Sequence, residues 1–195
     1  MTVRYTAPMT KLPKITVHGR FQPPAHQNHW LYILDAFNRA EYVIFLITNP
    51  DLDDRQVDEA PHRSQKENNP FTYDERVVMF QSLLAKKGYS ENRYSFAPFD
   101  IRDGESFGKL DKSTPNLINV YSPWSAKKVE LFEGHGLSVV QTHNDETSLV
   151  SGSDIRRIIR SSANLEEDLM AAGFVPEALG GLNRVLKSRR SKQLQ

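Results

Sequence analysis

A basic residue and two histidines follow a glycine in a short stretch near the start of the chain. Residues 19–29 run Gly-Arg-Phe-Gln-Pro-Pro-Ala-His-Gln-Asn-His, so the basic and imidazole side chains are Arg20, His26 and His29. Guanidinium and imidazole N–H groups donate hydrogen bonds to phosphate oxygens, and they stabilise the negative charge that builds up as a phosphoryl bond breaks. The stretch therefore predicts a site that binds phosphate groups.

The segments on either side of this stretch predict a strand followed by a helix. Residues 14–18 read Lys-Ile-Thr-Val-His and have the length of a short strand. Beyond the stretch, Trp30, Ile33, Leu34 and Phe37 recur at the spacing of one helix face. The first backbone N–H groups of a helix have no partner within it, and the helix dipole attracts anions. A phosphate is therefore the expected guest at this junction.

Two other interpretations of His26 and His29 remain open. Residues three apart can converge on a metal ion, although no further His, Asp or Glu lies nearby at the usual spacing of metal ligands. The pair can also be two surface histidines at a helix start. We favour phosphate binding, and we predict no metal site formed by protein side chains.

The rest of the chain alternates strand patterns with helix patterns. Residues 42–47 form a continuous apolar run, which is typical of a parallel strand covered on both faces. Thr72 and Glu75 have the spacing of a capping box, so a helix is expected from there to about residue 87. Further strands are predicted at 94–99, 117–121 and 137–140, further helices at 126–133 and 153–160, a helical C-terminal third, and irregular segments at 51–69 and 100–115.

This alternation predicts an α/β fold, a doubly wound and mostly parallel sheet with a helical C-terminal portion. Ligands of such sheets bind beyond the carboxyl ends of the strands, and residues 19–29 follow such an end. The 195 residues fit a single domain spanning 1–195, with a core at about 14–160 and C-terminal helices at about 161–190.

Composition narrows the class of protein. The 25 basic and 24 acidic residues nearly balance, so the overall charge predicts neither a nucleic-acid nor a membrane partner. The absence of cysteine excludes disulfides, thiolate catalysis and sulfur-ligated metals. The sequence shows no secretory signal and no apolar run of membrane-spanning length, so a cytoplasmic protein is expected. The basic residues of 184–195 predict a solvated helix end or a disordered tail, with an RNA or partner contact as the alternative.

Four features in order along the chain resemble the nucleotidyltransferase superfamily. Residues 19–23 followed by the histidine pair are similar to its glycine-rich turn and His-x-Gly-His motif, and Gly-Arg-Phe-Gln-Pro is the form seen in archaeal-type nicotinamide mononucleotide (NMN) adenylyltransferases. Residues 151–157, Ser-Gly-Ser-Asp-Ile-Arg-Arg, resemble the Ser-Gly-Thr-x-Ile-Arg motif. Residues 69–76, Asn-Pro-Phe-Thr-Tyr-Asp-Glu-Arg, resemble the Asn-Pro-Phe-Thr-x-x-Glu-Arg helix start. Residues 100–101 and 120–122 also fall in the expected order.

The chain departs from the family pattern at three points. Asn28 occupies the position of the motif's glycine, and asparagine tolerates left-handed backbone angles and caps helices. One extra residue separates Pro23 from His26, which predicts a widened turn. Phe107 stands where the archaeal-type enzymes carry a tryptophan that stacks on the nicotinamide ring, so the acceptor is less securely predicted than the use of ATP.

The resemblance implies adenylyl transfer from ATP to NMN, which gives NAD and pyrophosphate. The groups it implies as catalytic are Arg20, His26, His29 and Arg156. It further implies that Gly19 lets the backbone approach the triphosphate, and it adds Phe21, Gln22, Ser151 and Ser153 to the ATP site, with Ser153 as a helix cap. Mg²⁺ is expected as a cofactor that bridges phosphates more than protein groups.

The nicotinamide end of the site is assigned to Asp100, Ile101 and Phe107 by the same resemblance. Two alternatives stay open here, because Asp100 can simply cap a turn and Phe107 can be a core residue.

Other functions remain as alternatives. The same fold serves other acceptors, among them nicotinate mononucleotide, phosphopantetheine, or an alcohol phosphate in a CTP-dependent reaction. A nucleotide-sensing or RNA-binding module without turnover is a different class of function, and the sequence leaves homo-oligomerisation open.

Overall fold

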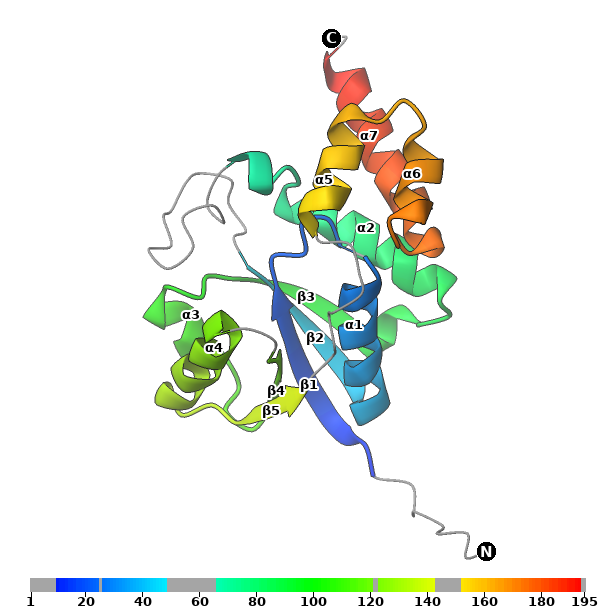
Figure 1. Cartoon of the computed structure of the whole chain (residues 1–195). Coiled ribbons are helices and arrows are strands. Elements are labelled where there is room, and N and C mark those ends of the chain that lie inside the picture. The colour runs from blue at the N-terminus through cyan, green and yellow to red at the C-terminus, as the bar shows by residue number, and fades with distance from the viewer. Residues whose placement is uncertain (1–9, 25, 49–65, 121–122, 143–151, 194–195) are drawn as a thin grey trace, which may run out of the picture.

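A computed structural model describes residues 10–24, 26–48, 66–120, 123–142 and 152–193 of the chain (Figure 1). Within these ranges, five parallel strands form one sheet in the order β3-β2-β1-β4-β5. The strands are β1 Leu12–Gly19, β2 Ala40–Thr48, β3 Tyr94–Phe99, β4 Asn116–Asn119 and β5 Val139–Thr142. The predicted doubly wound, parallel α/β fold is confirmed.

Helices cover both faces of this sheet. In Figure 1, α1 and α2 lie on one side, α3 and α4 lie on the other, and α5, α6 and α7 gather beyond the carboxyl ends of the strands. The helices are α1 Gln27–Arg39, α2 Tyr73–Lys86, α3 Gly104–Gly108, α4 Pro123–Gly134, α5 Gly152–Ser161, α6 Leu165–Ala171 and α7 Leu179–Gln193, with short 3-10 turns η2 Lys66–Asn68, η3 Glu91–Arg93 and η4 Pro176–Ala178.

The buried apolar side chains form two clusters, one on each face. Alternate residues of a strand point to opposite faces, so Val17 of β1 belongs to the cluster beneath α1, α2 and the C-terminal helices. The second cluster joins Ile118 of β4 to Phe132 of α4 and Phe107 of α3. The carboxyl end of the central strand β1 therefore lies between two different sets of helices, one on each face of the sheet.

The two helices nearest the glycine-rich turn begin as local sequence predicts, with one exception. Thr72 and Glu75 form the predicted capping box of α2. Asn28 differs from expectation, because α1 begins at Gln27 with His26 as its N-cap, which makes Asn28 a buried helical residue. The non-glycine residue with a positive φ in the described part of the chain is instead Phe21, at 47°.

Some boundaries differ from the sequence-based expectations. The segment 100–115 is not wholly irregular, because Asp103 caps α3 by accepting hydrogen bonds from two backbone N–H groups. Ser153 lies inside α5, which begins at Gly152, so it is not the cap. Strand β5 begins at Val139, two residues later than predicted. Most of the loop expected at 51–69 lies outside the described residues.

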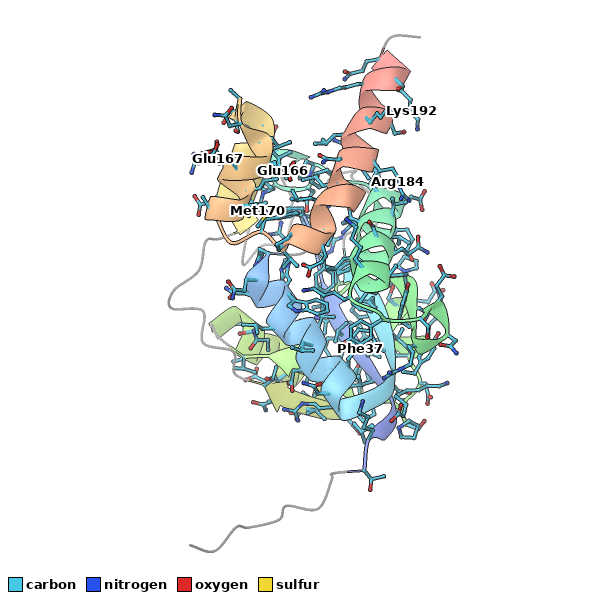
Figure 2. The ribbon with its side chains drawn as sticks, turned by 90° about the vertical axis from the view of Figure 1, so that its right-hand side faces the viewer. Phe37, Glu166, Glu167, Met170, Arg184 and Lys192 are labelled. Atoms are coloured by element: carbon cyan, nitrogen blue, oxygen red, sulfur yellow. The ribbon has the colours of Figure 1, made fainter. Side chains whose placement is uncertain are left out.

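The basic C-terminal segment forms the last turns of α7, along which Figure 2 shows Arg184 and Lys192. It is not entirely solvated, since Arg189 forms an ion pair with Glu75 at the start of α2. None of the described helices is long and apolar enough to cross a membrane.

Candidate functional site

The start of α1 places His26 and His29 against each other. Their rings stack with centroids 3.7 Å apart and planes at 29°, one helical turn apart on the same side. The ring of Phe21 contacts His29 edge-on at 5.2 Å. The loop after α6 anchors this helix start, because the backbone N–H of Gln27 donates to the carbonyl oxygen of Gly173 at 3.1 Å. The two imidazoles are therefore held in a defined arrangement.

Helix α5 brings Arg156 to the same place from the far end of the sequence. Its Nη1 donates to the carbonyl oxygen of Gln22 at 2.7 Å, and its Nη2 donates to Oγ of Ser153 at 2.8 Å. A Cβ built on Gly152 would lie 3.3 Å from Nη1 of Arg156 and 3.8 Å from Nε2 of His26. The absence of a side chain at Gly152 thus leaves room where the guanidinium and the imidazole converge.

Burial and neighbouring positive charges lower the pKa values of both histidines. Burial and then the charge of Arg156 lower the pKa of His26 from its ordinary value to about 4. Burial also lowers the pKa of His29, and the charges of His26, Arg20 and Arg156 act in the same direction, while a hydrogen bond with the backbone of Pro23 raises it. At neutral pH both imidazoles are therefore neutral and lie beside two guanidinium cations. We call Arg20, His26, His29 and Arg156 the His–Arg cluster.

Three polar atoms of the His–Arg cluster are buried without a hydrogen-bond partner among the described residues. They are Nδ1 of His26, Nδ1 of His29 and Nε of Arg156. Buried polar atoms in proteins are nearly always hydrogen-bonded, so such orphans call for an explanation. A ligand rich in oxygen atoms is complementary to a cationic cluster of this kind.

Comparison with known proteins places the chain in a family. No protein-family model matches it. The chain is 31% identical over 145 residues to a phosphonoformate cytidylyltransferase of Streptomyces viridochromogenes, covering 73% of this chain and 78% of that protein. The chain belongs to the nucleotidyltransferase superfamily. It is also 28% identical over 175 residues to a nicotinamide-nucleotide adenylyltransferase of Methanolobus tindarius, covering 89% of this chain and 92% of that protein.

Solved structures agree on the fold. Two structures of a bifunctional NMN adenylyltransferase/ADP ribose pyrophosphatase from Francisella tularensis match with TM-scores of 0.57 and 0.55. They are 17% and 15% identical to this nucleotidyltransferase and are matched over 79% and 94% of its chain, and the second is described as a complex with AMP and a manganese ion. The chain spans 44% and 57% of their lengths, and the likeness shows a shared fold.

Arg76 is a residue of this nucleotidyltransferase that sequence reasoning did not single out. It is fully buried, and its Nη1 donates to the carbonyl oxygens of Arg20 at 2.7 Å and Thr48 at 2.8 Å, while its Nε donates to that of Thr72 at 3.2 Å. Burial lowers the pKa of Arg76 to about 10, against the charges of neighbouring groups. It joins the turn after β1, the end of β2 and the start of α2. The signal for it was the arginine that ends the motif at 69–76.

The side chains of Gln22 and Phe21, two residues assigned to the ATP site, pack the turn. Gln22 is 3% exposed, and its amide donates to the carbonyl of Phe71 at 2.7 Å and accepts from the backbone N–H of Phe71 at 3.0 Å. Phe21 is also buried, and its ring lies 3.0 Å from where a Cβ on Gly19 would stand. A side chain at position 19 would therefore crowd the folded-back phenyl ring. The turn thus contributes the Arg20 side chain to the His–Arg cluster, and its backbone contacts the cluster through the carbonyl oxygen of Gln22.

At the predicted nicotinamide end, the assigned side chains are packed against other side chains of the protein. Phe107 is 3% exposed, and one face of its ring stacks on His135 at 4.1 Å with planes at 7°. It packs as a core residue, which is the alternative that the sequence left open for Phe107. Asp100 forms an ion pair with Arg102 at 2.9 Å and Ile101 is largely buried. Ser151 lies outside the described residues.

The metal interpretation of the histidine pair lacks further ligands. Among the described residues, no three His, Asp or Glu side chains are grouped so that they could hold a metal ion. The cations nearest to His26 and His29 are Arg20 and Arg156, whose charges would repel a metal. The cluster is electrostatically suited to an anion.

Proposed function

We propose that the chain transfers the adenylyl group of ATP to NMN, giving NAD and pyrophosphate. The observation that carries the proposal is the convergence of His26 and Arg156 beside Gly152, which joins the two motifs that resemble the family's triphosphate-binding segments. The similarity to the Methanolobus tindarius adenylyltransferase extends over most of both chains and supports NMN as the acceptor.

The reaction is an in-line displacement. An oxygen of the acceptor's phosphate attacks the α-phosphorus of ATP, a new P–O bond forms, and the bond from the α-phosphorus to the bridging oxygen breaks. The electron pair of that bond leaves with pyrophosphate. The attacking phosphate is ionised at neutral pH, so the enzyme needs to position the reactants and neutralise charge more than to move a proton.

The His–Arg cluster supplies both requirements. An anionic triphosphate raises the pKa of both imidazoles, and an imidazolium has two N–H groups. His29 can then keep its hydrogen bond to the backbone of Pro23 and still donate to an oxygen that gains charge in the transition state, which lowers the barrier. His26 and His29 are held for this role by their stack and by the anchored start of α1. Arg156 carries a full charge in a forked geometry that matches phosphate oxygens. Its present bonds to Gln22 and Ser153 keep the fork in place.

Mg²⁺ is part of the proposal as a partner of the nucleotide. The cluster consists of guanidinium and imidazole groups, so its residues suit phosphate oxygens and leave the ion to be carried by the triphosphate. When bound there, Mg²⁺ would neutralise charge on the leaving pyrophosphate. Arg20 and Arg156 would hold the oxygens that the ion does not occupy.

Cytidylyl transfer to a small phosphonate is the second candidate. The Streptomyces viridochromogenes relative, a phosphonoformate cytidylyltransferase, has the higher sequence identity of the two curated relatives. The burial of Phe107 also removes the aromatic face expected to stack on a nicotinamide ring. The chemistry at the α-phosphorus would be the same.

A substrate panel tests the proposal. The purified full chain is incubated with Mg²⁺ and either ATP or CTP against NMN, nicotinate mononucleotide, phosphopantetheine and phosphonoformate, with pyrophosphate release and product mass as readouts. ATP with NMN is expected to give the highest kcat/KM and a product of the mass of NAD. A preference for CTP with phosphonoformate would replace the first candidate by the second. Tight ATP binding without pyrophosphate release from any pair would support the nucleotide-sensing alternative.

A further inference from the structure

His18 has no part in the site described so far, although it directly precedes Gly19 at the carboxyl end of β1. Its ring lies on the sheet face opposite to Val17 and stacks on Phe132 of α4, with centroids 4.9 Å apart and planes at 23°. The stack determines the plane of the imidazole and thus the directions of its two nitrogens.

Both ring nitrogens of His18 are buried without a hydrogen-bond partner among the described residues. The residue is only 6% exposed, so water can satisfy little of this lost bonding. A phenylalanine or leucine would fill the same space without leaving polar atoms unpaired. A buried imidazole at this position therefore calls for a partner that is not part of the described chain.

The topology places His18 where a ligand is expected. The sheet order β3-β2-β1-β4-β5 means that the chain leaves β1 towards one neighbour and returns to the other, and α1 and α4 lie on opposite sides of this switch point. Ligands of open α/β sheets bind in the crevice outside the carboxyl ends of the strands at such a point. The His–Arg cluster belongs to the side of α1 and α5, whereas His18 belongs to the side of α4.

Phe132 links His18 to the region expected to receive the second substrate. The centroid of the same phenyl ring lies 5.8 Å from that of Phe99, the last residue of β3, and 5.1 Å from that of Phe107 in α3. His18 and the β3–α3 connection thus share one side of the sheet. If the triphosphate lies against the His–Arg cluster, the acceptor must approach from this other side of the β1 end.

The charge around His18 selects the chemistry of the partner. Lys128 lies four residues before Phe132 and therefore on the same side of α4 as the ring that stacks on His18. Burial and then the positive charge of Lys128 lower the pKa of His18. A neutral imidazole donor close to an ammonium group is complementary to an oxyanion, and an oxyanion would restore the pKa of His18 towards its ordinary value.

We propose that His18 and Lys128 bind an oxyanion of the acceptor substrate, a carboxylate or a non-attacking phosphoryl oxygen. The imidazole N–H donates the directional hydrogen bond and the lysine supplies the charge. That the oxyanion belongs to the acceptor rests on the proposed function, but binding of an oxyanion at His18 can be measured without turnover.

Binding to the full chain by titration calorimetry tests the inference. The probes are NMN, nicotinate mononucleotide, phosphonoformate and methylphosphonate, with ATP titrated separately. His18→Phe keeps an aromatic ring against Phe132 and removes the two ring nitrogens. It should raise the dissociation constant of the acceptor about tenfold or more, while the affinity for ATP stays unchanged. Lys128→Gln should act in the same direction, and Lys127→Gln, an exposed neighbour on α4, is the matched control.

The pattern across probes identifies the oxyanion. A loss for phosphonoformate and nicotinate mononucleotide, but not for methylphosphonate or NMN, assigns a carboxylate, whereas an equal loss for all four assigns a phosphoryl oxygen. A purely structural imidazole predicts lower thermal stability for His18→Phe, while a ligand-binding one predicts equal or higher stability because unpaired polar atoms are removed. Unchanged affinity for every probe that the wild type binds, or no binding of any probe by the wild type, would overturn the inference. A wild type that binds acceptors without releasing pyrophosphate would instead contradict the proposed function alone.

Discussion

Nη1 of Arg156 donates a 2.7 Å hydrogen bond to the carbonyl oxygen of Gln22, across 134 positions of the chain. The bond attaches the N-terminal half of α5 to the turn that follows the central strand. Because α5 also brings Gly152 beside His26, this single contact sets the relative position of the two motifs on which phosphate binding depends. Activity and local structure are therefore coupled at Arg156.

Replacing Arg156 with lysine should cost activity more than stability. An ammonium group retains the charge but cannot bond Gln22 and a phosphate oxygen in the forked geometry of a guanidinium. We expect kcat/KM for pyrophosphate release to fall by about 10²-fold, the size typical of losing one donor to developing charge. Arg157→Lys on the exposed side of the same helix is the control. Equal kinetics for the two variants would make Arg156 a structural residue only.

His29→Ala should lower kcat by about 10²-fold or more, since one N–H donor to the transition state is removed. His29→Phe preserves ring contact with His26 and Phe21 and should be as inactive as the alanine variant. Steady-state kinetics on protein with wild-type circular dichroism measures the effect. Near wild-type turnover in either folded variant would remove the imidazole from the mechanism.

Acid should destabilise the unliganded protein well above the range in which carboxylates titrate. The pKa of His26 is about 4 when folded and near 6.5 when unfolded, so between these values the unfolded state binds more protons. Stability therefore rises with pH across this window and is lost on acidification, by about 1.4 kcal/mol per pH unit for each such histidine. Urea unfolding from pH 7 to pH 5 measures the slope. His26→Asn, which puts a favoured N-cap residue at the start of α1, should reduce the slope by the share of one histidine, and an unchanged slope would contradict the assignment.

Arg76→Met should destabilise the fold by about 3 kcal/mol, because a buried donor is removed from the carbonyl oxygens of Arg20 and Thr48. The same change should impair turnover, since the turn that carries Arg20 loses its tie to α2. Chemical denaturation and pyrophosphate release are the two readouts. The exposed Arg184→Met is the matched control and should change neither. A stability equal to wild type would show that the buried guanidinium is dispensable.

Gly181 and Gly180 should respond oppositely to alanine. A Cβ on Gly181 would lie 2.9 Å from the Cα of Met79, whereas one on Gly180 meets the flexible end of Lys86. Gly181→Ala should therefore cost about 1–3 kcal/mol by forcing α7 away from α2. Gly180→Ala should be neutral or stabilise by up to about 1 kcal/mol through helix propensity. Melting temperatures compare the pair, and a shared sign would contradict the close approach of the helices.

Local pattern was sufficient for the elements that form the frame of the site. The apolar run of β2, the spaced face of α1 and the Thr72–Glu75 capping box are determined by neighbours within one or two turns, so the sequence predicted them. Boundaries shifted where a cap or strand end depends on tertiary partners, as at α3 and β5. The resemblance of motifs then supplied the superfamily, which similarity to a cytidylyltransferase bears out.

The order of residues was enough to indicate which side chains can bind phosphate and that they follow a strand or begin a helix. Which of these side chains meet depends on how the elements pack in space. His26 and Arg156 converge because α5 packs on the turn after β1, whereas Phe107 is buried because α3 packs against α4. Side-chain exposure and long-range contact depend on how whole elements pack, which spacing along the chain does not encode.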